Sequence, residues 1–144
     1  MKIKRLDRTD IKELIKLSNS EGFPYQLALD SAAIFCNGNI PDKPTQQSYG
    51  IFIDNRLVSV MTATFLYEFP HEDRPSGKVV QVSGAYTMPE YRHKRLATYL
   101  LKLIENDAKN YYKADYICCD SSADDLYKNA NWNYSNESRM WKML

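Results

Sequence analysis

The chain has 144 residues, 44% of them hydrophobic, with 19 Lys and Arg against 18 Asp and Glu. This length suits a single domain over residues 1–144, and the balanced charge gives no overall field that would attract nucleic acid or a membrane surface. No run approaches the roughly 20 apolar residues of a membrane span, the N-terminus lacks the apolar block of a signal peptide, and the three cysteines follow neither a metal-binding nor a disulfide pattern. We therefore expect a cytoplasmic protein with no metal, nucleic-acid or membrane partner.

The N-terminal part of the sequence alternates between strand and helix patterns. Charged and apolar residues alternate over Met1–Leu6, which predicts a short strand. Asp10 and Glu13 have the spacing of a capping box that opens a helix. A second helix is expected over Gln26–Cys36, and the prolines of Asn39–Gln47 indicate a loop.

The middle of the chain reads as β-structure. Ser48–Ile53 and Leu57–Phe69 are separated by the turn residues Asp54-Asn55, which predicts a β-hairpin. Lys78–Met88 is rich in valine and is expected to form the next strand. Gly84 inside that strand indicates either a bulge or a close approach of the backbone to another group.

After this strand the pattern changes to helix. Apolar residues recur at three- and four-residue intervals from Leu96 to about Asn110. Asp115–Cys119 then reads as a strand, Ala123–Asn131 as a short helix and Arg139–Leu144 as a final strand. The whole pattern predicts one α/β domain.

Four basic-capable residues, Arg92, His93, Lys94 and Arg95, precede the predicted helix at Leu96. A helix start carries unpaired N–H groups and a partial positive charge, so it can receive a phosphate. Basic side chains there cost about 0.3–1 kcal/mol each unless an anion offsets them. The loop is therefore either an anion site or a run of solvated charges.

This segment resembles the signature of the GNAT superfamily of N-acetyltransferases. The family has a Pro-x-x-Arg/Gln turn and then Arg/Gln-x-x-Gly-x-Gly/Ala, and Pro89 to Ala97 is similar to both. Leu126–Trp132 resembles the family's Leu-Tyr-x-x-x-Gly-Phe element, and residues 136–144 its closing strand. Three positions depart from the pattern, because His93, Arg95 and Asn131 stand where the family often has glycine.

The resemblance implies an α/β fold with a mixed, mostly antiparallel central sheet of six to seven strands flanked by about four helices. It also implies an N-acetyltransferase that moves an acetyl group from acetyl-CoA to a primary amine of a small molecule or peptide by direct attack. The backbone of Ala85, Tyr86 and Thr87 would bind the pantetheine arm and the thioester. The remaining cofactor-binding residues would be Arg92, His93, Lys94, Arg95, Leu96, Ala97 and Thr98.

By the same resemblance, Tyr127 would protonate the leaving thiolate, with Tyr134 as the reserve candidate. The alternative for Tyr127 is that it only packs in the core. A base for the amine is left open between Glu68, Asp120, Glu137 and a chain of water molecules.

Two other functions are compatible with the pattern. Arg95 and His93 in place of glycine would fit a catalytically weakened CoA-binding or regulatory module. The basic patch Arg92–Arg95 could serve an interaction domain, but the near-zero net charge argues against it. A homodimer, the acceptor and the effect of the two replaced glycines are left open.

Overall fold

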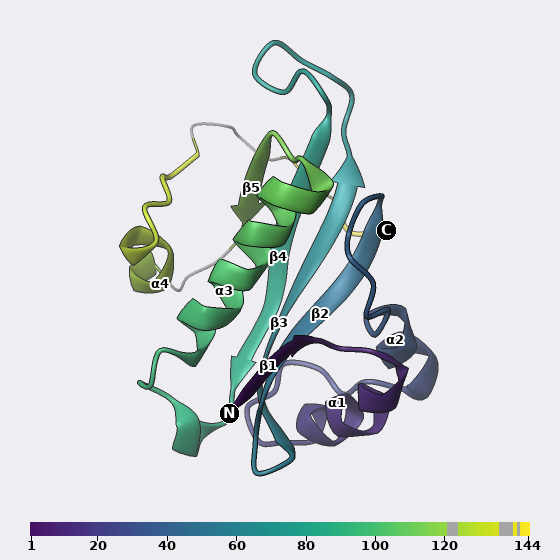
Figure 1. The fold of residues 1–144 in the computed structure, drawn as a ribbon, viewed down its shortest axis with the longest axis vertical. Coiled ribbons are helices and arrows are strands. Elements are labelled where there is room, and N and C mark those ends of the chain that lie inside the picture. Colours follow the sequence, from purple (N-terminus) through teal and green to yellow (C-terminus); the bar gives the residue numbers. More distant parts are fainter. Residues whose placement is uncertain (121–123, 136–139, 141) are drawn as a thin grey trace.

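The computed structural model describes residues 1–120, 124–135, 140 and 142–144 (Figure 1). Five strands form one sheet in chain order: β1 (Lys2–Arg5), β2 (Thr45–Ile53), β3 (Arg56–Tyr67), β4 (Lys78–Thr87) and β5 (Tyr116–Cys119). The α-helices of the described residues are α1 (Ile11–Ser18), α2 (Leu29–Ile34), α3 (Leu96–Asp107) and α4 (Asp124–Asn129). Short helical turns lie at η1 (Arg8–Asp10), η2 (Pro89–Tyr91) and η3 (Ala108–Tyr112).

The pairs β1–β2, β2–β3 and β3–β4 are antiparallel, whereas β5 runs parallel to β4. The α3 helix joins these two parallel strands. The prediction of a mixed, mostly antiparallel sheet with flanking helices is therefore confirmed, but the expected six to seven strands are not matched, since the described residues form five. For the final strand predicted over Arg139–Leu144, residues 139 and 141 lie outside the described part, and the described residues beside them are not in a strand.

The hairpin of β2 and β3 forms at the predicted turn. Asp54 and Asn55 have φ values of 51° and 62°. A two-residue hairpin turn requires positive φ, and Asp and Asn tolerate it better than other side chains. The strand before the turn is longer than predicted, because β2 begins at Thr45 rather than Ser48.

The first helix is capped one turn earlier than the sequence indicated. The capping box is made by Asp7, whose side chain accepts from the Thr9 N–H, and Asp10, whose side chain accepts from the Asp7 N–H. Lys4 holds both carboxylates, at 2.9 and 2.8 Å. Asp10 is therefore the third residue after the N-cap Asp7 in this capping box. The predicted capping box of Asp10 with Glu13 is wrong.

The second helix is shorter than the predicted Gln26–Cys36. It begins only at Leu29, because Ala28 is extended with φ −84° and ψ 165°. The preceding backbone is held in place by α1, where the Ser18 hydroxyl accepts from the Leu27 N–H at 3.0 Å. A tertiary hydrogen bond thus replaces the first turn that the sequence pattern predicted.

Helices cover both faces of the sheet. On one face, the Phe65 ring of β3 meets Tyr112, just beyond α3, at 5.3 Å between centroids. On the other face, the Tyr86 ring meets Phe23 in the connection after α1, at 4.8 Å. Figure 1 shows α3 crossing the sheet while α1 and α2 lie together beside β1 and β2. Within the described residues, no helix has the length and apolar character needed to cross a membrane.

Candidate active site

The strand before the basic loop contains a β-bulge. The register between β3 and β4 shifts there, so that Met61 alone faces both Gly84 and Ala85. Gly84 has a φ of 60°, a conformation that glycine adopts at little cost. The bulge confirms one of the two interpretations of Gly84, and it bends the end of β4.

The pairing of β4 with β5 ends just before the bulge, and we call this point the separation of β4 and β5. The last register pair between them is Val82 with Cys119, where β5 ends. The Ser83–Thr87 segment therefore extends past the described part of β5 and presents an edge with no β5 residue opposite it. Backbone N–H and C=O groups on such an edge are available to a ligand.

Tyr127 lies at this separation. It sits on α4 and is 8% exposed. Its side chain lies beside Cys119, the last residue of β5. The tyrosine thus reaches the point where the two parallel strands part.

A cavity of about 790 Å³ opens beside β5. Among its lining residues are Tyr127, Tyr134, Glu68 and Asp120. Two of the three predicted base candidates therefore share one cavity with both predicted acids. The third, Glu137, lies outside the described residues. No group of three or more potential metal ligands occurs in the described part of the chain.

The two carboxylates differ in their distance from Tyr127. Glu68 accepts from Arg74 Nη1 at 2.8 Å and from the Tyr116 hydroxyl at 2.9 Å. Burial and this bond to the carboxylate raise the pKa of Tyr116 to about 12. Tyr116 begins β5, three residues from Cys119, which is about 10 Å along a strand. Asp120 directly follows Cys119, so it lies at the strand separation and Glu68 does not.

The basic loop leads directly into α3. That helix begins at Leu96, as predicted, with Arg95 as its N-cap. Among the described residues no side chain caps this end, and the first turn contains no acidic residue. The helix start therefore presents backbone N–H groups and a partial positive charge to an anion.

The three residues that replace family glycines all have positive φ. The values are 63° at His93, 62° at Arg95 and 65° at Asn131. For His93 and Arg95 this conformation costs about 1–2 kcal/mol each relative to a right-handed one. The backbone thus keeps a glycine-like shape at each position although the side chains have changed.

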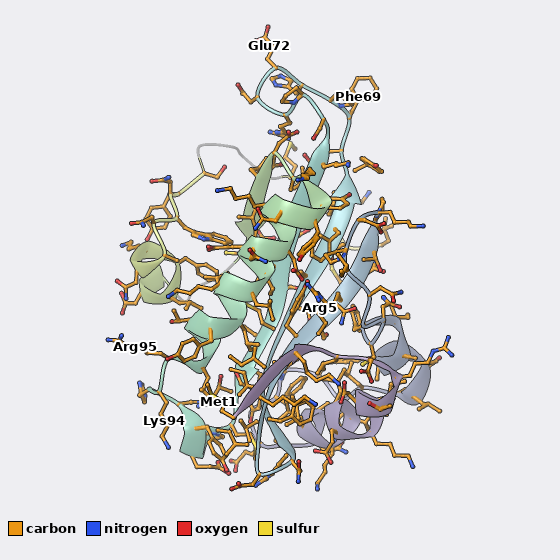
Figure 2. The ribbon with its side chains drawn as sticks, in the orientation of Figure 1. Met1, Arg5, Phe69, Glu72, Lys94 and Arg95 are labelled. Atoms are coloured by element: carbon orange, nitrogen blue, oxygen red, sulfur yellow. The ribbon has the colours of Figure 1, made fainter. Side chains whose placement is uncertain are left out.

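The basic side chains are exposed and point in different directions. Arg92 turns back to the sheet, where Nε donates to the Thr87 carbonyl at 2.8 Å. Lys94 and Arg95 project outward from the loop (Figure 2). The Arg95 side chain therefore points away from the rest of the molecule at the start of α3.

Sequence reasoning missed the contacts that hold Tyr127. Its ring packs on Trp132 at 4.7 Å between centroids, and Trp132 Nε1 donates to Glu105 of α3 at 2.7 Å. The other neighbour of the Tyr127 side chain is Cys119, at the end of β5. Nothing in the spacing of Cys118 and Cys119 indicated a contact with Tyr127.

Comparisons with solved structures agree with this geometry. The chain is similar to the ribosomal-protein-alanine N-acetyltransferase of Brucella melitensis biovar Abortus 2308, with a TM-score of 0.74, 17% identity and full coverage of both chains. It is also similar to a predicted acetyltransferase of Clostridium acetobutylicum that was solved with acetyl-CoA. The TM-score is 0.77 and the sequence identity 18%, over 98% of this chain and 95% of that one. The aminoglycoside acetyltransferase AAC(6')-Iy, in complex with a bisubstrate analogue, has a TM-score of 0.73 and a sequence identity of 15%. The match covers 99% of this chain and 97% of that one.

These identities show a common fold and leave the substrate open. A comparison with curated protein sequences found no match. The model of the acetyltransferase (GNAT) family matches residues 10–131, which is most of the chain. The bulged β4, the uncapped start of α3 and the tyrosine at the strand separation all lie within the matched residues. The chain belongs to the GNAT acetyltransferase family.

Proposed function

We propose that residues 1–144 act as one catalytic domain that transfers an acetyl group from acetyl-CoA to a primary amine of a small molecule or peptide. The observation that carries the proposal is the Tyr127 hydroxyl, which lies at the separation of β4 and β5 beside Cys119. A proton donor at this point suits a reaction that releases a thiolate.

The start of α3 and the basic loop would bind the diphosphate of the cosubstrate. The donors would be the backbone N–H groups of the first turn, aided by the exposed charges. The residues proposed to contribute are Arg92, His93, Lys94, Arg95, Leu96, Ala97 and Thr98. Their arrangement suits an anion because the helix dipole and the side chains have the same sign.

The free edge of β4 would hold the rest of the cosubstrate. Backbone groups of Ala85, Tyr86 and Thr87 would bind the pantetheine arm and orient the thioester. An N–H on this edge that points at the thioester carbonyl would stabilise the negative charge that develops on its oxygen. The bulge at Gly84 supports this role, because it shifts the register of β4 just before these residues.

Tyr127 would act as the general acid and Asp120, directly or through water, as the base for the amine. A free thiol has a pKa of about 8.5 and a free tyrosine about 10, so proton transfer to the thiolate is uphill by about 2 kcal/mol. The site must offset that difference. Asp120 is preferred to Glu68 because it directly follows Cys119 at the end of β5, whereas Glu68 bonds Tyr116 at the beginning of that strand.

The structural relatives provide the first acceptors to test. Two amines are offered to the protein with acetyl-CoA: kanamycin, as an aminoglycoside, and a short peptide that begins with alanine. A wider panel of amines follows, with thiol release and the mass of each product as readouts. We expect at least one amine to gain an acetyl group with one thiol released per acetyl.

Thermal melting with acetyl-CoA separates the remaining functions. Ligand at 100 times its dissociation constant should add about 2.7 kcal/mol to the free energy of unfolding. Stabilisation without acetylation of any amine would favour the CoA-binding module, for which Arg95 and His93 are the motivating residues. No stabilisation at millimolar acetyl-CoA would contradict both functions.

A further inference from the structure

Arg92 links the connection before α3 back to the end of β4. Its Nε donates to the Thr87 carbonyl at 2.8 Å, and its guanidinium carbon lies 5.7 Å from the centroid of the Tyr86 ring. The side chain therefore contacts two successive residues of β4, one through a charge-assisted hydrogen bond and one through a cation–π contact.

The two residues that Arg92 contacts are themselves held by other parts of the fold. The Thr87 hydroxyl shares a hydrogen bond of 2.7 Å with the hydroxyl of Ser59, a buried residue of β3. Tyr86 is buried, and its hydroxyl donates to the Glu21 carbonyl at 2.7 Å. Arg92 is thus attached to a part of β4 whose position is fixed by β3 and by the segment after α1.

The loop that follows Arg92 needs such an attachment. His93 and Arg95 have φ values of 63° and 62°, which are unfavourable for residues that carry a Cβ. Strained backbone conformations persist only where the surrounding structure enforces them. The hydrogen bond from Arg92 to Thr87 fixes the beginning of this loop, and so it helps to hold the backbone in the conformation that leads into α3.

We propose that Arg92 is a positioning residue that fixes the distance between the two halves of the cosubstrate site. The inference rests on the proposed function, which places the pantetheine arm on the edge that ends at Thr87 and the diphosphate at the start of α3. Acetyl-CoA joins these two groups covalently, so it binds best when the two half-sites have the spacing of the ligand. Arg92 sets that spacing through the Thr87 carbonyl.

This role predicts different effects on acetyl-CoA and on ADP. ADP carries a diphosphate but no pantetheine arm, so it occupies only one of the two half-sites. Loss of the hydrogen bond to Thr87 should therefore weaken the binding of acetyl-CoA and leave that of ADP nearly unchanged. A side chain that acted only on the diphosphate would change the affinity for both ligands by the same factor.

Two variants with side chains of equal length isolate the hydrogen bond. In Arg92→Gln the amide nitrogen is bonded to Cδ, as Nε is in arginine, so it can donate to Thr87 without a positive charge. Arg92→Met has neither the donor nor the charge. In calorimetric titrations we expect the Kd for acetyl-CoA to be about threefold to tenfold higher in Arg92→Met than in Arg92→Gln, the effect of one ordinary hydrogen bond. The Kd for ADP should differ less than twofold between them.

Lys94→Gln is the matched control for the loss of a positive charge. Lys94 lies in the same loop, and its ammonium nitrogen is 5.6 Å from the centroid of the Tyr91 ring. This variant should weaken acetyl-CoA and ADP by the same factor, and Arg92→Gln should match it within about twofold. Arg92 and Lys94 are both exposed, so these substitutions leave the core intact, and melting curves without ligand check that each variant folds.

The outcomes separate this inference from the proposed function. Equal Kd values for acetyl-CoA in Arg92→Met and Arg92→Gln would overturn the inference. It is also overturned if ADP loses as much affinity as acetyl-CoA between these two variants, because Arg92 would then act on the diphosphate half-site alone. If the unaltered protein binds neither acetyl-CoA nor ADP, the proposed function is wrong and the inference is wrong with it.

Discussion

Replacing Asp107 by alanine should lower the free energy of unfolding by about 3 kcal/mol. Asp107 is fully buried at the C-terminal end of α3. Its carboxylate accepts from Arg5 at 2.7 and 2.6 Å and from the Tyr49 hydroxyl at 2.7 Å. The substitution leaves both donors without this acceptor, and it removes the polar contacts that join α3 to β1 and β2.

The size of the effect follows from the burial of the partners. Removing one member of a buried ion pair typically costs about 3–5 kcal/mol. We expect the lower end of this range because the Arg5 side chain is 24% exposed, so water can hydrate it when the carboxylate is removed. Such a loss is large against the roughly 5–15 kcal/mol that stabilises a typical domain.

Urea unfolding measures this loss, with Glu90→Gln as the matched control. Glu90 pairs with Arg56 at 4.0 Å, and the two side chains are 54% and 49% exposed. An exposed pair contributes little, so the control should change the free energy of unfolding by less than about 0.5 kcal/mol. If Asp107→Ala and Glu90→Gln have the same free energy of unfolding, the Asp107 contacts do not stabilise the fold.

Tyr127→Phe should reduce kcat by about 100-fold or more and leave the stabilisation by acetyl-CoA nearly unchanged. A positioned general acid typically contributes about 10²–10⁴-fold to a rate. The substitution removes only the hydroxyl, and the ring can still pack on Trp132. Steady-state kinetics give the rate, and melting with acetyl-CoA gives the binding.

Tyr134→Phe is the matched control for this second prediction. Tyr134 lines the same cavity but is 70% exposed. An exposed phenol exchanges readily with water and is poorly placed to deliver one proton, so we expect kcat to change less than about threefold. If Tyr134→Phe causes the large loss and Tyr127→Phe does not, the reserve candidate is the acid.

Local sequence signals were sufficient for several parts of this fold. The turn at Asp54-Asn55 was predictable because its requirement, two positive φ values, falls on residues that tolerate them. The start of α3 at Leu96 was predictable because the apolar spacing changes there. In both cases the determining residues are neighbours in sequence, and the structure confirms them.

The sequence predictions were wrong where residues far away in the chain determine the local structure. Asp7 and Asp10 also have capping-box spacing, and the choice of this pair is supported by Lys4, which lies on β1. The start of α2 depends on the Ser18 hydroxyl of another helix. The contact of Asp107 with Arg5 joins residues 102 positions apart, which no local pattern can indicate.

In the candidate site, too, some features were predictable from the sequence and others depend on tertiary packing. The resemblance identified the loop and Tyr127, and the positive φ values at His93, Arg95 and Asn131 fit the glycine positions that it implied. The Cys119 contact could not be predicted, because it depends on where α4 packs against the end of β5.

A crystal structure of the protein with CoA bound tests the central claim most directly. We expect the diphosphate oxygens to accept hydrogen bonds from the first backbone N–H groups of α3, with Arg95 still at positive φ. The thiol of CoA should lie between the ends of β4 and β5, within hydrogen-bond reach of the Tyr127 hydroxyl. A diphosphate bound away from the start of α3, or a thiol remote from Tyr127, would contradict the account.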